Sequence, residues 1–217
     1  MKAVQRLNAS LQIPSLGAVA RCDSGRGAPG WSSGSTTHTR LSITAPTPPE
    51  VPLLHPAYPT TYEAAKGYEM TAGLGLMFDT TIALSRIILA GILDQCPKLK
   101  LVCPHVGGAL PYLIGRLDHQ TQVLKRGAEK IRKPPSEYLK QVYLDTVTPI
   151  ALGVRYAYDF AGADRLLFAS DHPWVDPRLI AGNVKSLRFP AEDEKKIFSG
   201  NARNLFKLTG TKWSEGL

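Results

Sequence analysis

The chain has 217 residues, enough to bury one sizeable core, and 43% of them are hydrophobic, which argues against disorder over the whole length. Its formal net charge of +8 raises the question of a nucleic-acid partner. The basic residues are scattered, however, and the densest stretch, 125–140, is interrupted by Glu129 and Glu137, so we expect no nucleic-acid partner.

Residues 1–49 form the first segment and are rich in Ser, Gly, Thr and Pro. This composition offers too little apolar surface to offset the entropy of ordering, so we predict a disordered, low-complexity tail that ends at residue 49. The first twenty residues contain no Asp or Glu, yet they lack the uninterrupted apolar run of a targeting peptide. With three cysteines in no paired spacing, the expected location is the cytoplasm.

From residue 50 onward, apolar runs alternate with stretches of helical spacing. Strands are predicted at 51–55, 99–103, 142–147 and 165–169. Helices are predicted at 62–70, 76–95, 110–130, 150–160, 192–199 and 201–208. The longest apolar run, 82–93, carries Arg86 in its middle and indicates a core helix, so we expect no membrane-spanning segment. The alternation itself predicts parallel strands joined by right-handed helical crossovers.

Three of the four predicted strands end at an ionisable residue, namely His55, His105 and Asp171. In a (β/α) barrel, the carboxyl ends of the strands are the face where chemistry is placed. A lone histidine at such a position more often serves packing, but three ionisable groups at equivalent places favour a site, because burying them is costly. Neutral imidazole nitrogens and carboxylate oxygens suit a divalent metal, Zn²⁺ in the first place and Mn²⁺ as the alternative.

Four motifs allow a comparison with a known family. They are PLLHP at 52–56, LVCPHVGGALPYLIGRLD at 101–118, LLFASDHPW at 166–174 and IFSGNARNLF at 197–206. In this order they resemble the second half of the amidohydrolase-related proteins, in the branch of aminocarboxymuconate-semialdehyde decarboxylase. The resemblance implies an α/β fold, a partial TIM (β/α)₈ barrel with about four β/α units and without the N-terminal half, which makes 50–217 one half-barrel domain.

The resemblance also assigns roles to individual residues. It makes His55 and Asp171 metal ligands, and His105 and Asp171 catalytic groups, with Asp171 as the proton shuttle. Arg116 matches an arginine that in some members reaches the substrate carboxylate of a neighbouring subunit, and its planar guanidinium suits that group. Asp145, at the end of the third strand, is interpreted as structural.

The activity implied is that of a metal-dependent carboxy-lyase acting on a small aromatic or unsaturated carboxylic acid. Two alternatives stay open. The same metal site would also suit hydrolysis of a lactone, ester or amide. The second alternative is an inactive barrel fragment that serves as a binding module.

One feature of the family is absent from this sequence: a His-x-His or Glu-x-His pair after a first strand. The five histidines stand apart, at positions 38, 55, 105, 119 and 172. Without that pair we expect weakened metal binding. A half barrel also leaves open sheet edges, so we expect either an incomplete gene product or a homodimer in which two halves complete one barrel.

Overall fold

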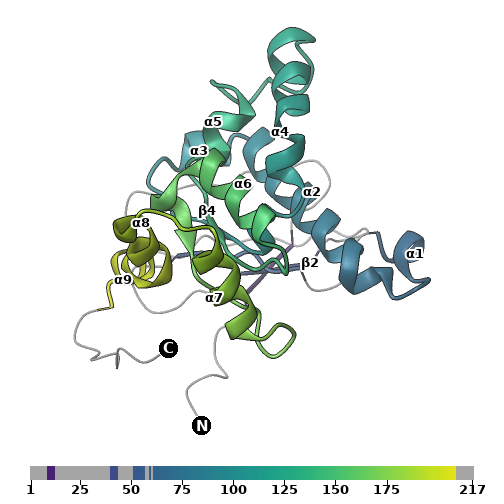
Figure 1. Ribbon diagram of the computed structural model, residues 1–217. Helices are drawn as coiled ribbons and strands as arrows, with labels where there is room; N and C mark the ends of the chain where they lie inside the picture. Colours follow the sequence, from purple (N-terminus) through teal and green to yellow (C-terminus); the bar gives the residue numbers. More distant parts are fainter. Residues whose placement is uncertain (1–8, 13–39, 44–50, 57–58, 60, 209–217) are drawn as a thin grey trace.

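A computed structural model describes residues 9–12, 40–43, 51–56, 59 and 61–208 (Figure 1). The strands are β1 (Ala9–Gln12), β2 (Arg40–Ile43), β3 (Val102–Cys103), β4 (Tyr143–Asp145) and β5 (Leu166–Leu167). The central sheet is parallel and has the order β3-β4-β5, so the strands neighbour one another in the order of the sequence. This is the arrangement that successive right-handed crossovers produce.

A fourth parallel segment lies beside β3. Leu53 forms a parallel bridge with Val102, and the amide of Leu54 donates to the carbonyl of Val102 at 2.9 Å. The predicted strand 51–55 thus forms isolated bridges and no continuous ladder, because Pro52 and Pro56 have no N–H to donate.

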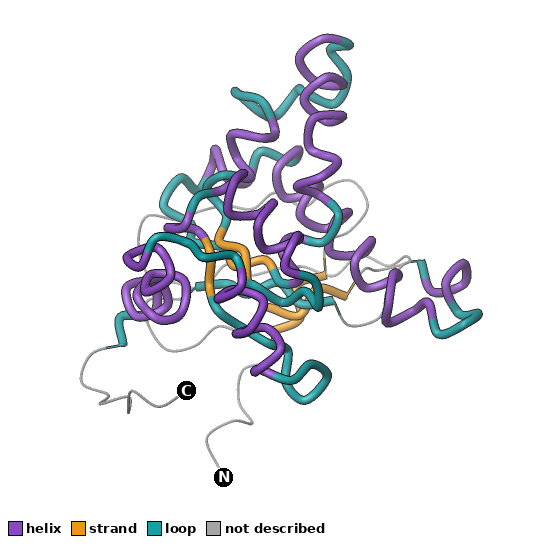
Figure 2. Tube along the Cα trace, in the orientation of Figure 1, coloured by secondary structure: helices purple, strands orange, loops and turns teal. Residues whose placement is uncertain are grey.

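Helices follow the strands and lie around the sheet, as Figure 2 shows. The α-helices are α1 (Tyr62–Ala65), α2 (Leu76–Leu89), α3 (Ile92–Gln95), α4 (Leu110–Asp118), α5 (Pro135–Leu139), α6 (Ala151–Ala161), α7 (Pro177–Ser186), α8 (Ala191–Lys195) and α9 (Asn201–Phe206). Short 3₁₀-helices are η2 (His105–Gly107) and η4 (Ala163–Arg165), and π-helical turns are η1 (Thr71–Gly75), η3 (His119–Val123) and η5 (Lys196–Gly200). Four consecutive parallel segments with helical crossovers make this part of a (β/α)₈ barrel.

The two faces of the sheet carry different clusters, because successive side chains of a strand point to opposite sides. Cys103, Leu144 and Leu166 pack with the helices in the large core, which includes Leu84 and Ile88 of α2. The opposite face contributes to a second, smaller cluster of buried residues. That cluster consists of Val51, Val102, Leu167 and Leu205.

Several predicted helices are shorter in the structure than in the prediction. The predicted helix 76–95 is interrupted at Gly91, which adopts φ 70° and approaches the carbonyl oxygen of Lys130 so closely that a Cβ would lie 2.1 Å from it. A left-handed residue cannot continue an α-helix, so α3 starts anew. The predicted helix 62–70 ends at Ala65, and the predicted helix 110–130 ends at Val123.

The stretch Thr71–Leu89 qualifies by length and composition as a possible membrane span, with a mean hydropathy of 1.4 over its apolar window. The sequence predicts no membrane span here, because Arg86 interrupts the longest apolar run. Of that window, 44% is buried within the protein, and Leu84 and Ile88 are fully enclosed in the core. The burial agrees with the predicted core helix.

Within the predicted tail, β1 and β2 form a two-stranded antiparallel sheet in which Ala9 faces Ile43. The sequence did not predict this sheet. The other residues of 1–49 lie outside the described part of the chain, and the tail and its boundary at residue 49 stay predictions.

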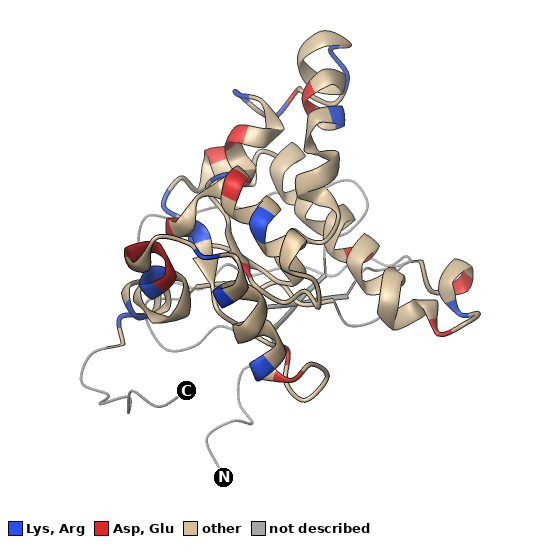
Figure 3. Cartoon of the chain, in the orientation of Figure 1, with Lys and Arg blue, Asp and Glu red and all other residues tan. Residues whose placement is uncertain are grey.

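Lys and Arg are interspersed with Asp and Glu over the described surface (Figure 3). Several of them form ion pairs with a residue one helical turn away. Lys140 pairs with Glu137 at 2.9 Å, and Arg155 pairs with Asp159 at 2.8 Å. The charge of the 125–140 stretch is therefore partly neutralised locally.

Candidate metal and catalytic site

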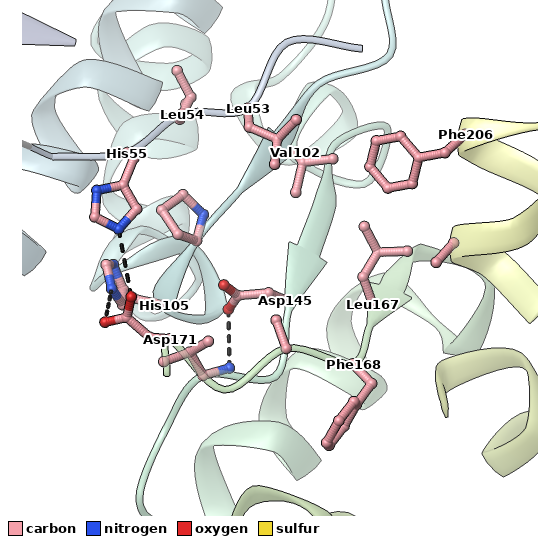
Figure 4. Close-up of a pocket in the computed structure, with 14 residues that line it drawn as sticks. Leu53, Leu54, His55, Val102, His105, Asp145, Leu167, Phe168, Asp171 and Phe206 are labelled. Atoms are coloured by element: carbon pink, nitrogen blue, oxygen red, sulfur yellow. Dashed lines mark hydrogen bonds and ion pairs between the residues drawn. The ribbon is translucent and has the colours of Figure 1, made fainter. Parts of the chain in front are cut away.

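Three ionisable side chains meet at the carboxyl ends of the parallel segments (Figure 4). Nε2 of His55 lies 3.7 Å from Oδ1 of Asp171, and Nε2 of His105 lies 3.6 Å from Oδ2 of the same carboxylate. One possible ligand atom from each residue falls within 4.8 Å of the other two. The tertiary structure thus brings together the three strand-end residues that the sequence singled out.

The ring of His55 is oriented by a contact with the backbone of the next residue. Its Nδ1 lies 2.9 Å from the carbonyl oxygen of Pro56. Because a carbonyl only accepts hydrogen bonds, Nδ1 is the donor, and Nε2 of the neutral ring keeps its lone pair. That lone pair points toward Asp171, which is the orientation a metal ligand needs.

His105 and Asp171 stand on strained backbone. His105 has φ 54°, the following Val106 has φ 57°, and Asp171 has φ 59°. Residues other than glycine rarely occupy this left-handed region, and clusters of them are typical of functional sites. The turns redirect the chain so that both side chains face the space above the strand ends.

The imidazole of His105 is nearly enclosed, with 8% of the side chain exposed. Burial lowers its pKa, and the nearby carboxylate of Asp171 opposes this shift. The ring is therefore neutral at pH 7. Its Nδ1 is buried and has no hydrogen-bond partner within the described ranges.

Asp145, the last residue of β4, adds a second carboxyl to the site. It is buried and lines the same cavity, and its Oδ1 accepts hydrogen bonds from the amides of Val106 at 3.1 Å and Val147 at 3.0 Å. Burial raises the pKa of Asp145 to about 7, although these amides pull it down. The sequence interpretation of Asp145 as structural missed that it lies at the site, and its strand-end position was the available signal.

The cluster opens into a cavity of about 440 Å³. Its walls are mostly apolar side chains of the inner sheet face and of α9. Among them are Leu53, Val102, Leu167, Phe168 and Phe206. Apolar walls with a few convergent polar groups at one end are typical of a small-molecule site, and this volume falls in the range such sites occupy.

Arg116 lies apart from these residues. It is in the last turn of α4, its side chain is exposed, and it does not line the cavity of its own chain. The structure therefore gathers three of the four predicted site residues and leaves Arg116 on the outer surface.

The donor set fits a divalent ion. Two imidazole nitrogens and a carboxylate oxygen are ligands that Zn²⁺, Mn²⁺ and similar ions accept. His55 and Asp171 would hold the ion, with His105 beside it.

Imidazole and carboxylate groups at the carboxyl ends of parallel strands lie on the face where a (β/α) barrel places its chemistry. The chain belongs to the amidohydrolase family, whose model matches residues 46–208. This confirms the family that the motifs indicated.

Several curated relatives of the chain are decarboxylases. The chain is 32% identical over 162 residues to a gamma-resorcylate decarboxylase from Polaromonas sp., which covers 71% of this chain and 50% of that protein. It is 22% identical to 2-amino-3-carboxymuconate-6-semialdehyde decarboxylase from Dictyostelium discoideum, over 64% of this chain and 40% of that protein. It spans about half the length of the curated relatives it matches.

A solved structure with the same fold is a dihydroxybenzoic acid decarboxylase from Polaromonas sp., with a TM-score of 0.65 and 28% identity over 74% of this chain and 50% of that one. It was solved with bound manganese and the inhibitor 2-nitroresorcinol. These similarities support a divalent metal, and nothing in them specifies zinc.

Proposed function

We propose that this chain carries the metal-binding and proton-transferring half of a carboxy-lyase that acts on a small aromatic or unsaturated carboxylic acid. The observation that carries the proposal is the cluster of His55, His105 and Asp171 in the lining of a mostly apolar cavity. Residues 50–217 form its catalytic domain, preceded by the tail at 1–49. The decarboxylases named above support this choice of reaction.

The cavity favours a planar, apolar ring. Val102, Leu167 and Phe206 supply apolar walls, and the polar groups lie together near the strand ends. A ring carboxylic acid would place its ring against the walls and its carboxylate toward the cluster. Water is excluded from the ring by the same side chains.

Asp171 is the group that moves the proton. Its carboxylate is partly exposed and lies between two imidazoles, so it can exchange a proton with solvent and with a substrate carbon. As the bond between that carbon and the carboxylate breaks, the electron pair stays on the carbon, the proton of Asp171 joins it, and CO₂ leaves. A bound divalent ion would polarise the substrate's oxygens.

Neutral His105 has a separate task. Its Nε2 faces the same carboxylate, and the enclosed ring has little freedom to turn. It therefore holds Asp171 or a substrate oxygen by a hydrogen bond while the proton moves. Because the ring of His105 is already in place, Asp171 is the residue of the cluster that has to move during the reaction.

Arg116 completes the site from a second copy of the chain. Since it is exposed and remote from its own cavity, it reaches a substrate carboxylate only in a neighbouring subunit. This proposal makes the active form a homodimer. The ion is Zn²⁺ or Mn²⁺, and the cytoplasm remains the expected location.

The test uses the purified full chain, loaded with Mn²⁺ or Zn²⁺ and assayed on aromatic carboxylates, lactones and esters. We expect elemental analysis to find about one retained ion per chain and the carboxylates to release CO₂. Asp171→Asn should lower kcat by about 10²–10⁴, since it removes the proton-transferring group. His119→Asn changes an exposed histidine outside the cluster and should leave both readouts unchanged.

Three results would replace the proposal. If no ion is retained, catalysis by this chain is excluded and the binding-module alternative stands. If acid accumulates from lactones or esters without CO₂, the chain is a hydrolase. If Asp171→Asn keeps full CO₂ release, the cluster is not the catalytic site.

A further inference from the structure

The end of β4 contacts both loops that carry His105 and Asp171, although β4 contributes neither of these residues. β4 lies between β3 and β5 in the sheet, so the two loops that leave its neighbours pass on either side of it. The residues at this end are Asp145, the last of the strand, and Thr146, which follows it.

Asp145 holds the loop after β3. Its Oδ1 accepts from the amide of Val106, 39 residues earlier in the chain, and from the amide of Val147 in its own loop. The first of these amides belongs to the left-handed turn that orients His105. The carboxylate thus ties that turn to β4 from inside the protein.

Thr146 holds the loop after β5. Its hydroxyl donates to the carbonyl of Ala169 at 3.1 Å and accepts from the amide of the same residue at 3.2 Å. Thr146 is fully buried, and Ala169 precedes Asp171 by two residues. One side chain therefore pairs both backbone groups at the point where the chain turns toward the carboxylate.

We infer that Asp145 and Thr146 are positioning residues that together set the separation of His105 and Asp171. Both loops adopt backbone conformations that are unfavourable by themselves, so contacts from outside each loop are required to maintain them. The catalytic consequence rests on the function proposed above, whereas the geometric claim does not. A displacement of about 1 Å in such a site costs about 10²-fold in rate.

The experiment compares three variants of the full chain with the wild type. Thr146→Val keeps the shape but removes the hydroxyl, and Thr146→Ser keeps the hydroxyl. Thr121→Val is the matched control, because Thr121 is similarly buried and its hydroxyl donates to the carbonyl of Leu117, a local contact only four residues earlier in the chain. Circular dichroism and thermal melting confirm that each variant is folded.

The first readout is the dissociation constant of Mn²⁺, followed by electron paramagnetic resonance. We expect Thr146→Val to weaken binding about tenfold or more, with Thr146→Ser and Thr121→Val within about twofold of the wild type. Where decarboxylation is measurable, kcat should fall in Thr146→Val with KM nearly unchanged. Asp145→Ala, compared with Asp145→Asn, which keeps an Oδ1 acceptor, should lower kcat in the same way and change Mn²⁺ affinity little, because Asp145 orients His105.

Crystal structures of the Thr146 variants give a readout that needs neither metal nor turnover. The separation of Nε2 of His105 and Oδ2 of Asp171 should widen by about 0.5 Å or more in Thr146→Val and stay unchanged in Thr146→Ser. A folded Thr146→Val protein with the wild-type separation overturns the inference. A wild type that binds no Mn²⁺ overturns the proposed function instead, and the crystal structures still decide the positioning role.

Discussion

At the residue scale, Asp145 supports the His105 turn through a hydrogen bond, and its buried carboxyl lowers the stability of the protein. Its carboxyl is enclosed, and burial raises its pKa from 3.8 to about 7. The amides of Val106 and Val147 offset only part of the desolvation of the charged form. A leucine would be easier to bury at this place, so the carboxyl costs stability that its two hydrogen bonds to the amides only partly offset.

This shift predicts how stability depends on pH. Between the unfolded pKa of 3.8 and the native value of about 7, the native state holds a proton that the unfolded state has released. Stability therefore falls as pH rises through this window, by at most about 4 kcal/mol, and the full loss is present above pH 7. Asp145→Asn removes this ionisation.

Urea unfolding of both proteins at several pH values between 4 and 8 measures the effect. The free energy of unfolding of Asp145→Asn should increase relative to the wild type as pH rises. A difference that is the same at every pH would show that Asp145 ionises with an ordinary pKa in the native state.

The two histidines of the cluster should respond differently to replacement. His55→Ala removes a proposed ligand and should weaken Mn²⁺ binding by about 10–100-fold. His105→Ala should leave Mn²⁺ affinity within a few-fold and lower kcat. Equal losses of affinity in calorimetric titrations of both variants would make His105 a ligand as well.

At the scale of elements, α2 supports the loop after β3 from the side opposite to β4. The amide of Ala109 donates to Oγ1 of Thr81 at 2.9 Å, and Gly108 adopts φ 64° where it meets the helix. A Cβ on Gly108 would lie 2.7 Å from the carbonyl oxygen of Met77 and 2.8 Å from the Thr81 hydroxyl. Only glycine permits this approach of loop and helix.

Gly108→Ala should therefore destabilise the protein by about 2–4 kcal/mol, through backbone strain and the clash with α2. Gly182→Ala in α7 is the matched control, because no heavy atom lies within 4 Å of its Cβ position. It should stabilise by about 0.5–1 kcal/mol, as alanine does in a helix interior. Chemical denaturation measures both, and similar effects would contradict the described contact.

At the scale of the whole molecule, the sheet ends at two edges. Among the described residues, neither the segment 51–56 nor β5 pairs with a further parallel strand on its outer side. Open edges and an apolar inner face favour association. We expect a homodimer in solution, which light scattering after size-exclusion chromatography would detect as twice the chain mass of 23.6 kDa. A monomer with little dye-accessible apolar surface would contradict it.

Mixing two inactive variants tests whether Arg116 acts across the subunits. In a random mixture of Arg116→Ala and Asp171→Asn, half of the dimers contain one intact site, so about 25% of wild-type activity should return. Activity that stays at the level of the separate variants would place Arg116 outside the site or within its own subunit.

The order of strands and the cluster members could be predicted from the sequence, because both depend on local patterns. Apolar runs predicted the strand positions, and His55, His105 and Asp171 each lie at the end of such a run or two residues beyond it. Helix ends were predicted less well, since Gly91 ends α2 through its conformation and through its approach to Lys130, a residue distant in the chain.

By itself, the sequence determined the family, the barrel-type strand order and the three residues of the cluster. Each of these properties depends on short contiguous motifs. Only the tertiary structure decided that Asp145 and Thr146 hold the two loops, that His105 is enclosed, and that Arg116 faces away from its own cavity. Those properties depend on contacts between segments that are far apart in the chain, and packing of the complete fold sets them.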